Sequence, residues 1–296
     1  MAKIVEFNIL YLAQFVKSYL IETENYNIFI DGGIKRNEEN IRPYLQNGKK
    51  NVCIVTHGHW DHIGLCSAIQ AAGGILYGNA RDKRYYTDFN WDWQVGFEQY
   101  KEDCNIPPER SDLFWSEIGN VAPLDKFVWD GDMLTFDDVT LKILELPGHT
   151  RGSIGIYLPD DDILFTGDAL MGSGFFGGCT QYCDYLGYVR SMEKIIALNP
   201  KTVYTAHTET LSDHTGAELA KAGLETGKAI EKTVDEYLST FKGAEISVPA
   251  IAKVVAEKIG RNFGGGACVS VISHLALCKA QDARIEKCLE KYVYGV

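Results

Sequence analysis

The sequence has no run of about 18 consecutive apolar residues, the length that a membrane-spanning helix requires. It also lacks the uninterrupted apolar stretch and small-residue cleavage site of a secretory leader near its start, where polar residues break up the apolar ones. Both absences predict that the chain stays in the cytoplasm and contacts no membrane.

An excess of basic charge is also missing. The formal net charge at pH 7 is −11, and residues 208–296 are nearly neutral and have no basic stripe. Such a surface does not attract the phosphates of nucleic acids, so the composition argues against a nucleic-acid partner. Part of the acidic excess consists of carboxylates that a bound cation would neutralise.

No two of the eight cysteines have the CxxC spacing of a redox or zinc motif. Scattered cysteines in a cytosolic protein are typically free thiols, and several of these are expected to be buried. Cys179 and Cys183 lie close together in the sequence. For these two, the pattern leaves a redox pair or additional metal ligands open beside the free thiols.

What the sequence does contain is an alternation of short apolar, β-branched runs with helical patterns. This alternation predicts an α/β fold. Strands are predicted within the first thirty residues, including 15–21 and 27–31, and at 51–56, 140–146, 153–158, 163–166 and 202–205. Helices are predicted at 37–47, 63–72 and 185–198.

Two segments depart from this alternation. Residues 81–120 are crowded with aromatic side chains and contain Pro107-Pro108, so we expect an inserted helical flap there. Residues 213–296 show helical periodicity at 213–241, at 247–259 and in pieces of 267–292. The chain is therefore predicted to divide into a catalytic domain, residues 1–212, and a helical tail, residues 213–296.

The stretch that carries chemistry is His57-Gly58-His59-Trp60-Asp61-His62, which directly follows a predicted buried strand. Alternate residues of an extended segment point the same way, so His57 and His59 can converge on one point. Asp61 and His62 come where the chain turns into a helix, and they can face a neighbouring point. Three imidazoles and a carboxylate at this spacing are typical donors for zinc in a hydrolytic site.

Three more donors each follow the end of a predicted strand. They are His149 in Leu-Pro-Gly-His-Thr, Asp168 in Leu-Phe-Thr-Gly-Asp and His207 in Val-Tyr-Thr-Ala-His. Strand ends in α/β proteins carry functional sites because a rigid sheet holds the loops there. We predict that these three residues join the first four, whereas His214 and His274 are assigned no role in the site.

The order HxHxDH, PGHT, TGD and a final strand-end histidine resembles the metallo-β-lactamase superfamily over most of residues 10–212. The resemblance implies an α/β fold of the four-layer αββα sandwich type with a C-terminal helical appendage, part of which faintly resembles a winged-helix-like tail. It also implies that His57, His59 and His149 hold one metal, that Asp61, His62 and His207 hold a second, and that Asp168 bridges both.

The resemblance further implies a hydrolase of the glyoxalase II or lactonase type with two divalent metal ions. Zinc is the first choice, and manganese or iron also suit these ligands. A hydroxide that bridges the metals would be the nucleophile, and Asp61 and Asp168 would orient the water and move its proton. With this site we expect cleavage of an ester, thioester or lactone of a small molecule.

The sequence says less about substrate residues and partners. We expect Trp91 and Trp93 of the flap, with Phe175 and Phe176 of the glycine-rich loop after Asp168, to line an apolar pocket. Two other activities stay open, a phosphodiesterase or ribonuclease and a mononuclear-iron dioxygenase. A homodimer also stays open.

Overall fold

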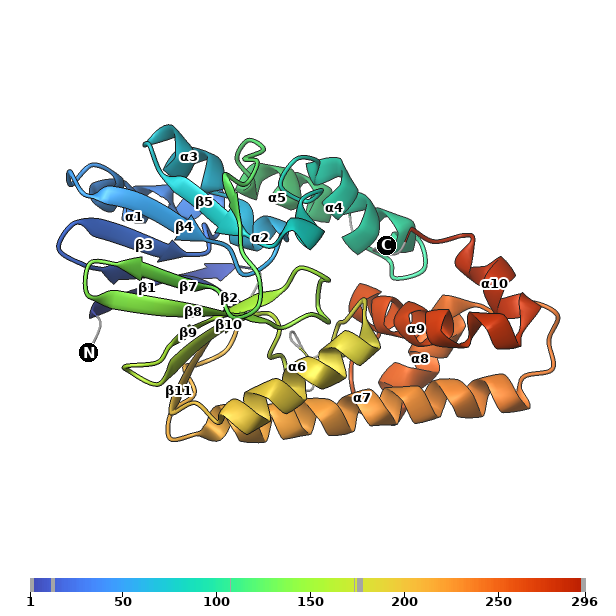
Figure 1. The fold of residues 1–296 in the computed structure, drawn as a ribbon. Helices are drawn as coiled ribbons and strands as arrows, with labels where there is room; N and C mark the ends of the chain where they lie inside the picture. The colour runs from blue at the N-terminus through green and yellow to red at the C-terminus, as the bar shows by residue number, and fades with distance from the viewer. Residues whose placement is uncertain (1–2, 12–13, 107, 173, 175–177, 294–296) are drawn as a thin grey trace.

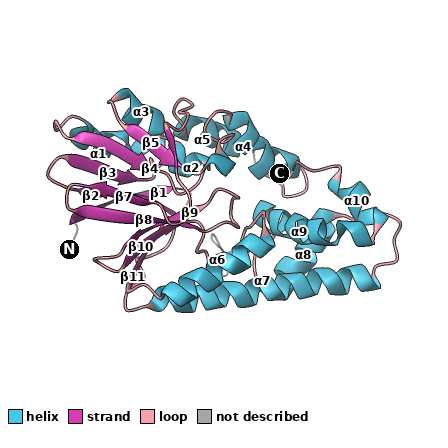
Figure 2. Cartoon of the chain, in the orientation of Figure 1, coloured by secondary structure: helices cyan, strands magenta, loops and turns pink. Residues whose placement is uncertain are grey.

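The computed structural model describes residues 3–11, 14–106, 108–172, 174 and 178–293. Two β-sheets lie face to face, with helices on both outer sides (Figures 1 and 2). The first sheet has the spatial order β1 (Lys3–Tyr11), β2 (Gln14–Glu22), β3 (Tyr26–Ile30), β4 (Lys50–Ile54), β5 (Ile75–Gly78) and β6 (Lys126–Phe127). The second has the order β11 (Thr202–Thr205), β10 (Ile163–Gly167), β9 (Ile154–Leu158), β8 (Val139–Glu145) and β7 (Met133–Phe136).

Strand direction explains where the loops of these sheets gather. In the first sheet, β1 to β3 pair antiparallel and β3 to β6 pair parallel. In the second, β7 to β10 pair antiparallel, whereas β11 is parallel to β10. Because β8, β10 and β11 run in the same direction, the loops that follow them leave the sheet at one end.

The interface between the two sheets forms a central hydrophobic core. Alternate residues of each strand face this interface, and they include Ile21, Ile28, Val52 and Ile54 of the first sheet and Leu141, Ile143, Ile154 and Phe165 of the second. The residues between them are buried as well, on the opposite face of the first sheet, as Leu20, Phe29 and Cys53 show. Burial on both faces explains why these strands appear as continuous apolar runs in the sequence.

Helices cover the outer face of each sheet. α1 (Glu38–Leu45), α3 (Cys66–Ala71) and α5 (Glu109–Glu117) pack over the first sheet. α6 (Tyr185–Leu198) and α7 (Thr215–Thr240) pack over the second, where Tyr188 and Met192 belong to the same buried cluster as Leu164 and Val203. The predicted four-layer αββα sandwich is therefore confirmed.

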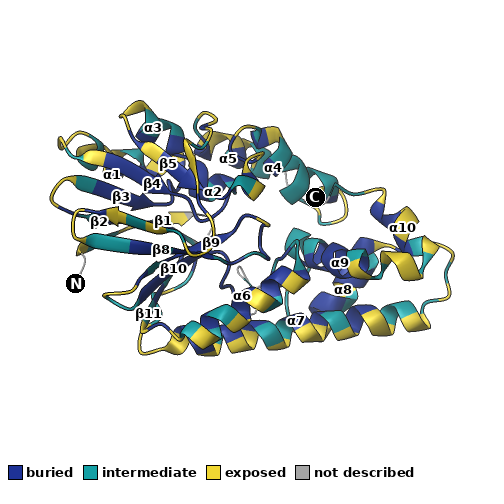
Figure 3. Ribbon diagram, viewed as in Figure 1, coloured by how far each residue is buried: buried dark blue, intermediate teal, exposed yellow. Residues whose placement is uncertain are grey.

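The C-terminal helices share a core with this sandwich. α8 (Val248–Lys258), α9 (Gly265–Cys278) and α10 (Ala283–Leu289) contribute to the buried cluster that α6, α7 and the second sheet form. Figure 3 shows buried residues along the sides of α7 and α9 that meet. The predicted helical appendage is confirmed, and none of its described helices is long and apolar enough to cross a membrane.

The last described residues, Tyr292 and Val293, contact the insertion at 81–120, which holds α4 (Phe89–Gly96), α5 and a short 3-10 helix at Glu98–Tyr100 (Figure 1). The rings of Tyr292 and Tyr100 stack with their centroids 6.1 Å apart. Val293 N donates to Gln99 Oε1 over 2.8 Å. The insertion and the segment that follows α10 are therefore in contact.

The helix predicted at 63–72 is present but begins later than expected. The structure has α2 (Trp60–Ile63) and α3 there, separated at Gly64-Leu65. The helix breaks where the carbonyl of Gly64 accepts a hydrogen bond from Gly119 N, 3.0 Å away in the insertion. Glycine is unfavourable inside a helix, so Gly64 is a local signal for this break, whereas the contact with Gly119 is visible only in the structure.

Candidate metal centre

The seven predicted ligands come together where loops from both sheets meet. The segment after β4 and helix α2 carry four of them, and the loops after β8, β10 and β11 carry one each: His57, His59, Asp61, His62, His149, Asp168 and His207. Their donor atoms form overlapping groups of three in which all atoms lie within 4.8 Å of one another. The structure brings all seven to one place, and their role as ligands stays a prediction.

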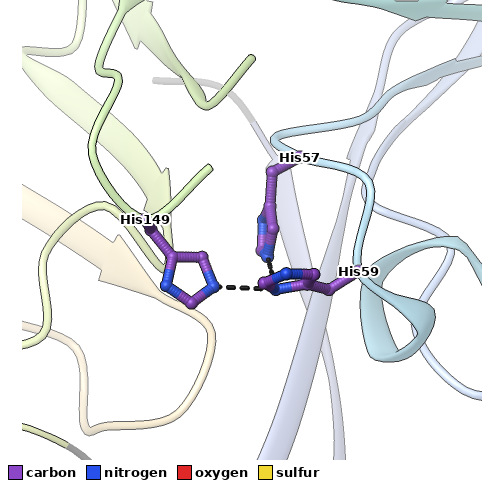
Figure 4. Close-up of side chains that lie close together, drawn as sticks. All are labelled: His57, His59 and His149. Carbon is purple, nitrogen blue, oxygen red and sulfur yellow. Dashed lines mark hydrogen bonds between the residues drawn. The ribbon is translucent and has the colours of Figure 1, made fainter. Parts of the chain in front are cut away.

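His57, His59 and His149 form the first group (Figure 4). Nδ1 of His59 lies 3.1 Å from Nε2 of His57 and 2.8 Å from Nε2 of His149. If Nδ1 of His59 carries a proton, it can donate that proton well to only one of the other two ring nitrogens. The lone pair of the remaining nitrogen is then left without a donor. A cation among them would accept all three lone pairs, in the manner of a zinc site.

Asp61, His62 and His207 form the second group, and Asp168 lies between the two. Nε2 of His207 lies 3.2 Å from Oδ2 of Asp61 and 3.4 Å from Oδ1 of Asp168. The same Oδ1 lies 3.4 Å from Nε2 of His62, whereas Oδ2 of Asp168 lies 3.5 Å from Nε2 of His149. Each carboxylate oxygen of Asp168 therefore faces one group, which is the arrangement that a bridging ligand needs.

Two atoms of the centre, 3.4 Å apart, are buried without a hydrogen bond of ordinary geometry among the described residues. They are Nε2 of His62 and Oδ1 of Asp168. An unsatisfied buried polar atom costs about 1–3 kcal/mol, so native proteins rarely leave one. A cation between these atoms would satisfy both. The imidazoles and carboxylates thus fit a divalent metal ion such as zinc, manganese or iron.

Asp31 orients His62 from outside the ligand set. Oδ2 of Asp31 lies 2.8 Å from Nδ1 of His62, and the carboxylate also accepts from the backbone N (2.7 Å) and Oγ1 (2.9 Å) of Thr56. With Nδ1 bonded to a carboxylate, Nε2 of His62 is left to face the centre. The sequence pattern identifies Asp31 only as part of a turn. In the structure its backbone is left-handed, with a φ of 64°, a conformation that residues other than glycine adopt rarely.

Backbone carbonyls orient two other histidines. Nδ1 of His207 donates to the carbonyl of Phe15 over 2.7 Å, and Nδ1 of His149 donates to the carbonyl of Gln181 over 3.1 Å. Because Nδ1 of each ring is bonded to a carbonyl, Nε2 of each ring faces the centre. These acceptors are main-chain atoms, and no residue type at positions 15 or 181 signals them.

Asp82, in a short 3-10 helix at Ala80–Asp82, ties together the loops that carry the histidines of the first group. Its carboxylate accepts from Gly58 N (3.1 Å), Thr150 Oγ1 (2.6 Å) and Gly152 N (2.8 Å). Burial raises the pKa of Asp82. It stands at the start of the irregular insertion with no motif around it, so sequence reasoning does not find it.

The two groups differ in their preference for protons. Burial and the nearby imidazoles lower the pKa of His57 well below its ordinary value, and burial together with His149 lowers the pKa of His59 to about 3. Burial also opposes protonation of His207, but Asp168 and Asp61 outweigh it and raise its pKa to about 10. The first group therefore offers neutral lone pairs, and the second holds the carboxylate charge that a cation would neutralise.

A cavity of about 470 Å³ opens onto both groups. Five of the predicted ligands form one wall, and the insertion, the segment 178–181 and the start of α9 form the others. The lining includes Phe97, Cys104, Ile106 and Arg110 of the insertion, Gln181, and Gly264 to Ala267. The volume is that of a small-molecule site.

The tryptophans predicted to contact substrate lie elsewhere. Trp93 stacks on Phe97 with ring centroids 5.0 Å apart, and Trp91 lies under the guanidinium of Arg84, 3.6 Å from its Cζ. Both pack within the insertion, and neither is among the described residues that line the cavity, where Phe97 takes their place. Phe175 and Phe176 lie outside the described residues.

The structure also describes Cys179 and Cys183, whose role the sequence leaves open, and the two histidines that were assigned no role in the site. Burial raises the pKa of Cys179 to about 11 and that of Cys183 to about 12, which favours the protonated thiol. Both are free thiols. His214 bonds the carbonyl of Asn199 at the exposed start of α7, and His274 is buried in α9.

A comparison of the chain with known protein families agrees with this site and fold. The profile of the family described as "Metallo-beta-lactamase superfamily" matches residues 12–207, which is more than half of the chain. The chain belongs to the metallo-beta-lactamase superfamily, as the sequence motifs predict.

Individual relatives share about a quarter to a third of their residues with this chain, over part of its length. The chain is 26% identical over 234 residues to the beta-lactamase-like protein 2 homolog of Caenorhabditis elegans, and the match covers 76% of this chain and 61% of that protein. It is 35% identical over 156 residues to a hydroxyacylglutathione hydrolase of Brucella ovis, over 51% of this chain and 55% of that enzyme. The chain thus spans less than two thirds of the length of these relatives.

Solved structures resemble the chain over nearly its whole length. A metallo-beta-lactamase family protein of Thermus thermophilus has a TM-score of 0.69 and 18% identity, and covers 95% of this chain and 93% of its own. A beta-lactamase domain protein of Burkholderia ambifaria has a TM-score of 0.70 and 15% identity, with 95% and 87% covered. At these identities the likeness concerns the fold, and with this coverage it extends to the C-terminal helices.

Proposed function

We propose that this chain is a dinuclear metal-dependent hydrolase that cleaves an ester, thioester or lactone of a small molecule. The observation that carries the proposal is the pair of donor groups, joined by Asp168, on the wall of a cavity with room for a small molecule. Membership of the superfamily and the likeness to a hydroxyacylglutathione hydrolase support hydrolysis as the reaction.

We propose a role for each of the seven residues. His57, His59 and His149 would hold one ion, Asp61, His62 and His207 the other, and Asp168 both. Two bound divalent ions supply polarisation of the scissile carbonyl and acidification of a water molecule. Asp61 and Asp168 would orient that water and hold its proton until the leaving group takes it. The burial of His57, His62 and Asp168 excludes bulk solvent and strengthens these charge interactions.

Zinc is the ion that we propose first, because three neutral imidazoles form one of the two groups. Iron is the principal alternative. A solved structure that is 21% identical, with a TM-score of 0.52 over 72% of this chain and 96% of its own, holds that protein in a di-iron-bound form.

Arg110 suggests the charge of the substrate. Among the described residues that line the cavity, it is the one lysine or arginine. Its Cζ lies 5.5 Å from the centroid of the Phe97 ring, and within the described part of the chain it forms no ion pair with a carboxylate. A guanidinium on a cavity wall binds carboxylates or phosphates with two parallel hydrogen bonds. We therefore propose that the substrate carries an anionic group away from the cleaved bond.

Matched thioesters test both parts of the proposal. Glutaryl and glutaramoyl N-acetylcysteamine differ by one carboxylate in the acyl half, and acetyl-N-acetylcysteine and acetyl-N-acetylcysteamine differ by one in the thiol half. We expect zinc-dependent hydrolysis with a lower KM for at least one anionic member. Arg110→Gln should raise that KM about 10-fold or more and leave the neutral counterpart unchanged.

The outcomes separate the two parts. Equal KM values within each pair, unaffected by Arg110→Gln, would overturn the anionic substrate and leave the hydrolase intact. No hydrolysis of any thioester, ester or lactone with zinc, manganese or iron would overturn the hydrolase. Iron at one equivalent per chain together with oxygen consumption would identify a dioxygenase instead.

A further inference from the structure

The loop that carries His149 rests on the segment of residues 180–185, which leads into α6. Nδ1 of His149 donates to the carbonyl of Gln181 over 3.1 Å. The amides of Cys183 and Asp184 both donate to the carbonyl of Gly148, over 2.8 and 3.2 Å. The position and ring orientation of His149 therefore depend on where this segment lies.

The C-terminal helix α9 holds the same segment from its other side. Oγ of Ser270 donates to the carbonyl of Thr180 over 2.7 Å and accepts from the amide of Tyr182 over 3.2 Å. One hydroxyl thus holds the peptide groups on both sides of Gln181. A second hydroxyl, that of Ser273, accepts from the amide of Tyr185 over 2.8 Å.

The two serines that make these contacts are buried. Ser270 is 0% exposed and Ser273 is 5% exposed. Within the described part of the chain, residues 180–184 pair with no strand, and the serine hydroxyls bond main-chain groups there that a neighbouring strand would otherwise bond. Removing a hydroxyl would leave buried main-chain groups unpaired, and the segment would shift to find new partners.

We propose that Ser270 is a positioning residue for the metal centre: through the peptide groups around Gln181 it sets the ring of His149. The hydrogen bond from Nδ1 of His149 keeps the proton on that nitrogen, so that Nε2 presents its lone pair beside His59 and Asp168. The C-terminal helices thus form part of the metal centre, although none of the proposed ligands lies on them. This inference rests on the proposed function in one respect, that His149 binds a metal.

The test compares Ser270→Ala with Thr233→Val in the full chain. Thr233 is buried in α7, and its hydroxyl donates to the carbonyl of Ala229 over 2.8 Å, so its removal also costs one buried hydrogen bond in the same group of helices. Zinc affinity is measured by competition with a chromophoric chelator, and cobalt spectra report the ligand field. Ring-nitrogen NMR of the histidines reports the tautomer of His149.

We expect Ser270→Ala to weaken one of the two zinc ions about 10- to 100-fold, the range found when outer-shell partners are lost. It should also change the cobalt spectrum and the Nδ1 signal of His149. Thr233→Val should lose stability and keep wild-type zinc affinity. If Ser270→Ala fails to fold, Ser273→Ala, one contact further from Gln181, should show a smaller loss of the same ion.

Each result decides the question. Zinc affinity and cobalt spectra that are unchanged in Ser270→Ala or, where that variant fails to fold, in Ser273→Ala would overturn the positioning role and leave the proposed hydrolase standing. Equal losses in Ser270→Ala and Thr233→Val would overturn it too, because the effect would then be one of stability alone. A wild-type chain that binds no divalent metal would overturn the proposed function itself.

Discussion

The proposed ligands differ in how deeply their side chains are buried, and therefore in how much a substitution would disturb the fold. Asp61 is the carboxylate among the proposed ligands that is most open to the cavity, with 13% of its side chain exposed, whereas Asp168 is 7% exposed. A substitution at Asp61 therefore removes a donor with little effect on the buried core. This makes Asp61 the residue at which chemistry and folding are most easily separated.

Asp61→Asn keeps the size of the side chain and removes its charge. We expect kcat to fall about 100-fold or more, because the side chain no longer orients or accepts the proton of water. One metal equivalent should be lost, with a melting temperature near that of the wild type. Metal analysis and steady-state kinetics check this, with Asp112→Asn on the exposed side of α5 as control. Full turnover with two metals in Asp61→Asn would contradict the assignment.

His274 predicts a pH dependence of stability. It is buried in α9, where Tyr182 Oη lies 2.8 Å from its Nε2, and burial lowers its pKa to about 4. Its unfolded pKa is about 6.5, so between these values the unfolded chain binds a proton that the folded chain does not. Its folded pKa is depressed, so stability falls as the pH decreases from 6.5 towards 4, by about 2 kcal/mol at pH 5.

His274→Gln keeps a hydrogen-bond acceptor and does not titrate. The loss of unfolding free energy between pH 7.5 and pH 5 should therefore be about 2 kcal/mol smaller in this variant than in the wild type. Urea denaturation of the metal-free proteins measures the difference. Identical losses in both proteins would show that His274 is not the titrating group.

At the scale of elements, the turn between His57 and His59 is shaped by its contact with the insertion. A Cβ at Gly58 would lie 2.4 Å from the Cβ of Tyr85, and Gly58 N donates to Asp82. Only glycine lets the two segments approach so closely. The glycine of the HxH motif is thus explained by packing against residues 82–85, which the motif itself does not reveal.

Gly58→Ala should push the turn away from Tyr85. We expect a loss of about 1–3 kcal/mol of stability, as in other overpacked sites, and weaker metal binding because His57 and His59 move with the turn. Thermal unfolding and metal titration check both effects. Adding Tyr85→Ala should restore part of the metal affinity by making room. If the double variant binds metal no better than Gly58→Ala, the steric explanation is wrong.

At the scale of the whole molecule, the C-terminal helices and the second sheet share one hydrophobic cluster. Leu164 and Val203 of the sheet belong to the same cluster as Ile230 of α7, Ile251 of α8 and Val271 of α9. Removing the helices would expose this apolar surface to water, at about 25 cal/mol for each Å². The body of residues 1–212 is therefore not expected to be an independent folding unit.

A chain that ends at residue 212 tests this expectation. We expect it to lose near-UV circular dichroism, to bind a hydrophobic dye and to bind metal weakly, while the full chain unfolds in one cooperative transition. Circular dichroism and metal analysis of both chains are the measurements. A truncated chain that unfolds cooperatively and holds two metals would show that the helices are an accessory.

How much of the site is predictable from the sequence depends on how local its signals are. His57, His59, Asp61 and His62 lie within six residues, and His149, Asp168 and His207 each follow a recognisable strand. Residues that act across the fold carry no such signal. Asp31, Asp82 and Ser270 lie in a turn, a short 3-10 helix and a C-terminal helix, and only their hydrogen bonds reveal what they do.

The sequence by itself determined the family, the αββα fold class and the identity of the seven candidate donors, because strand patterns and donor spacing are properties of neighbouring residues. The tertiary structure decided the rest. It placed Phe97 and Arg110 on the cavity wall, kept Trp91 and Trp93 within the insertion, and joined α9 to the loop of His149. These outcomes depend on contacts between segments that lie more than a hundred residues apart in the sequence, as Phe97 and Ala267 on the cavity wall do, and such contacts form only once the chain has folded.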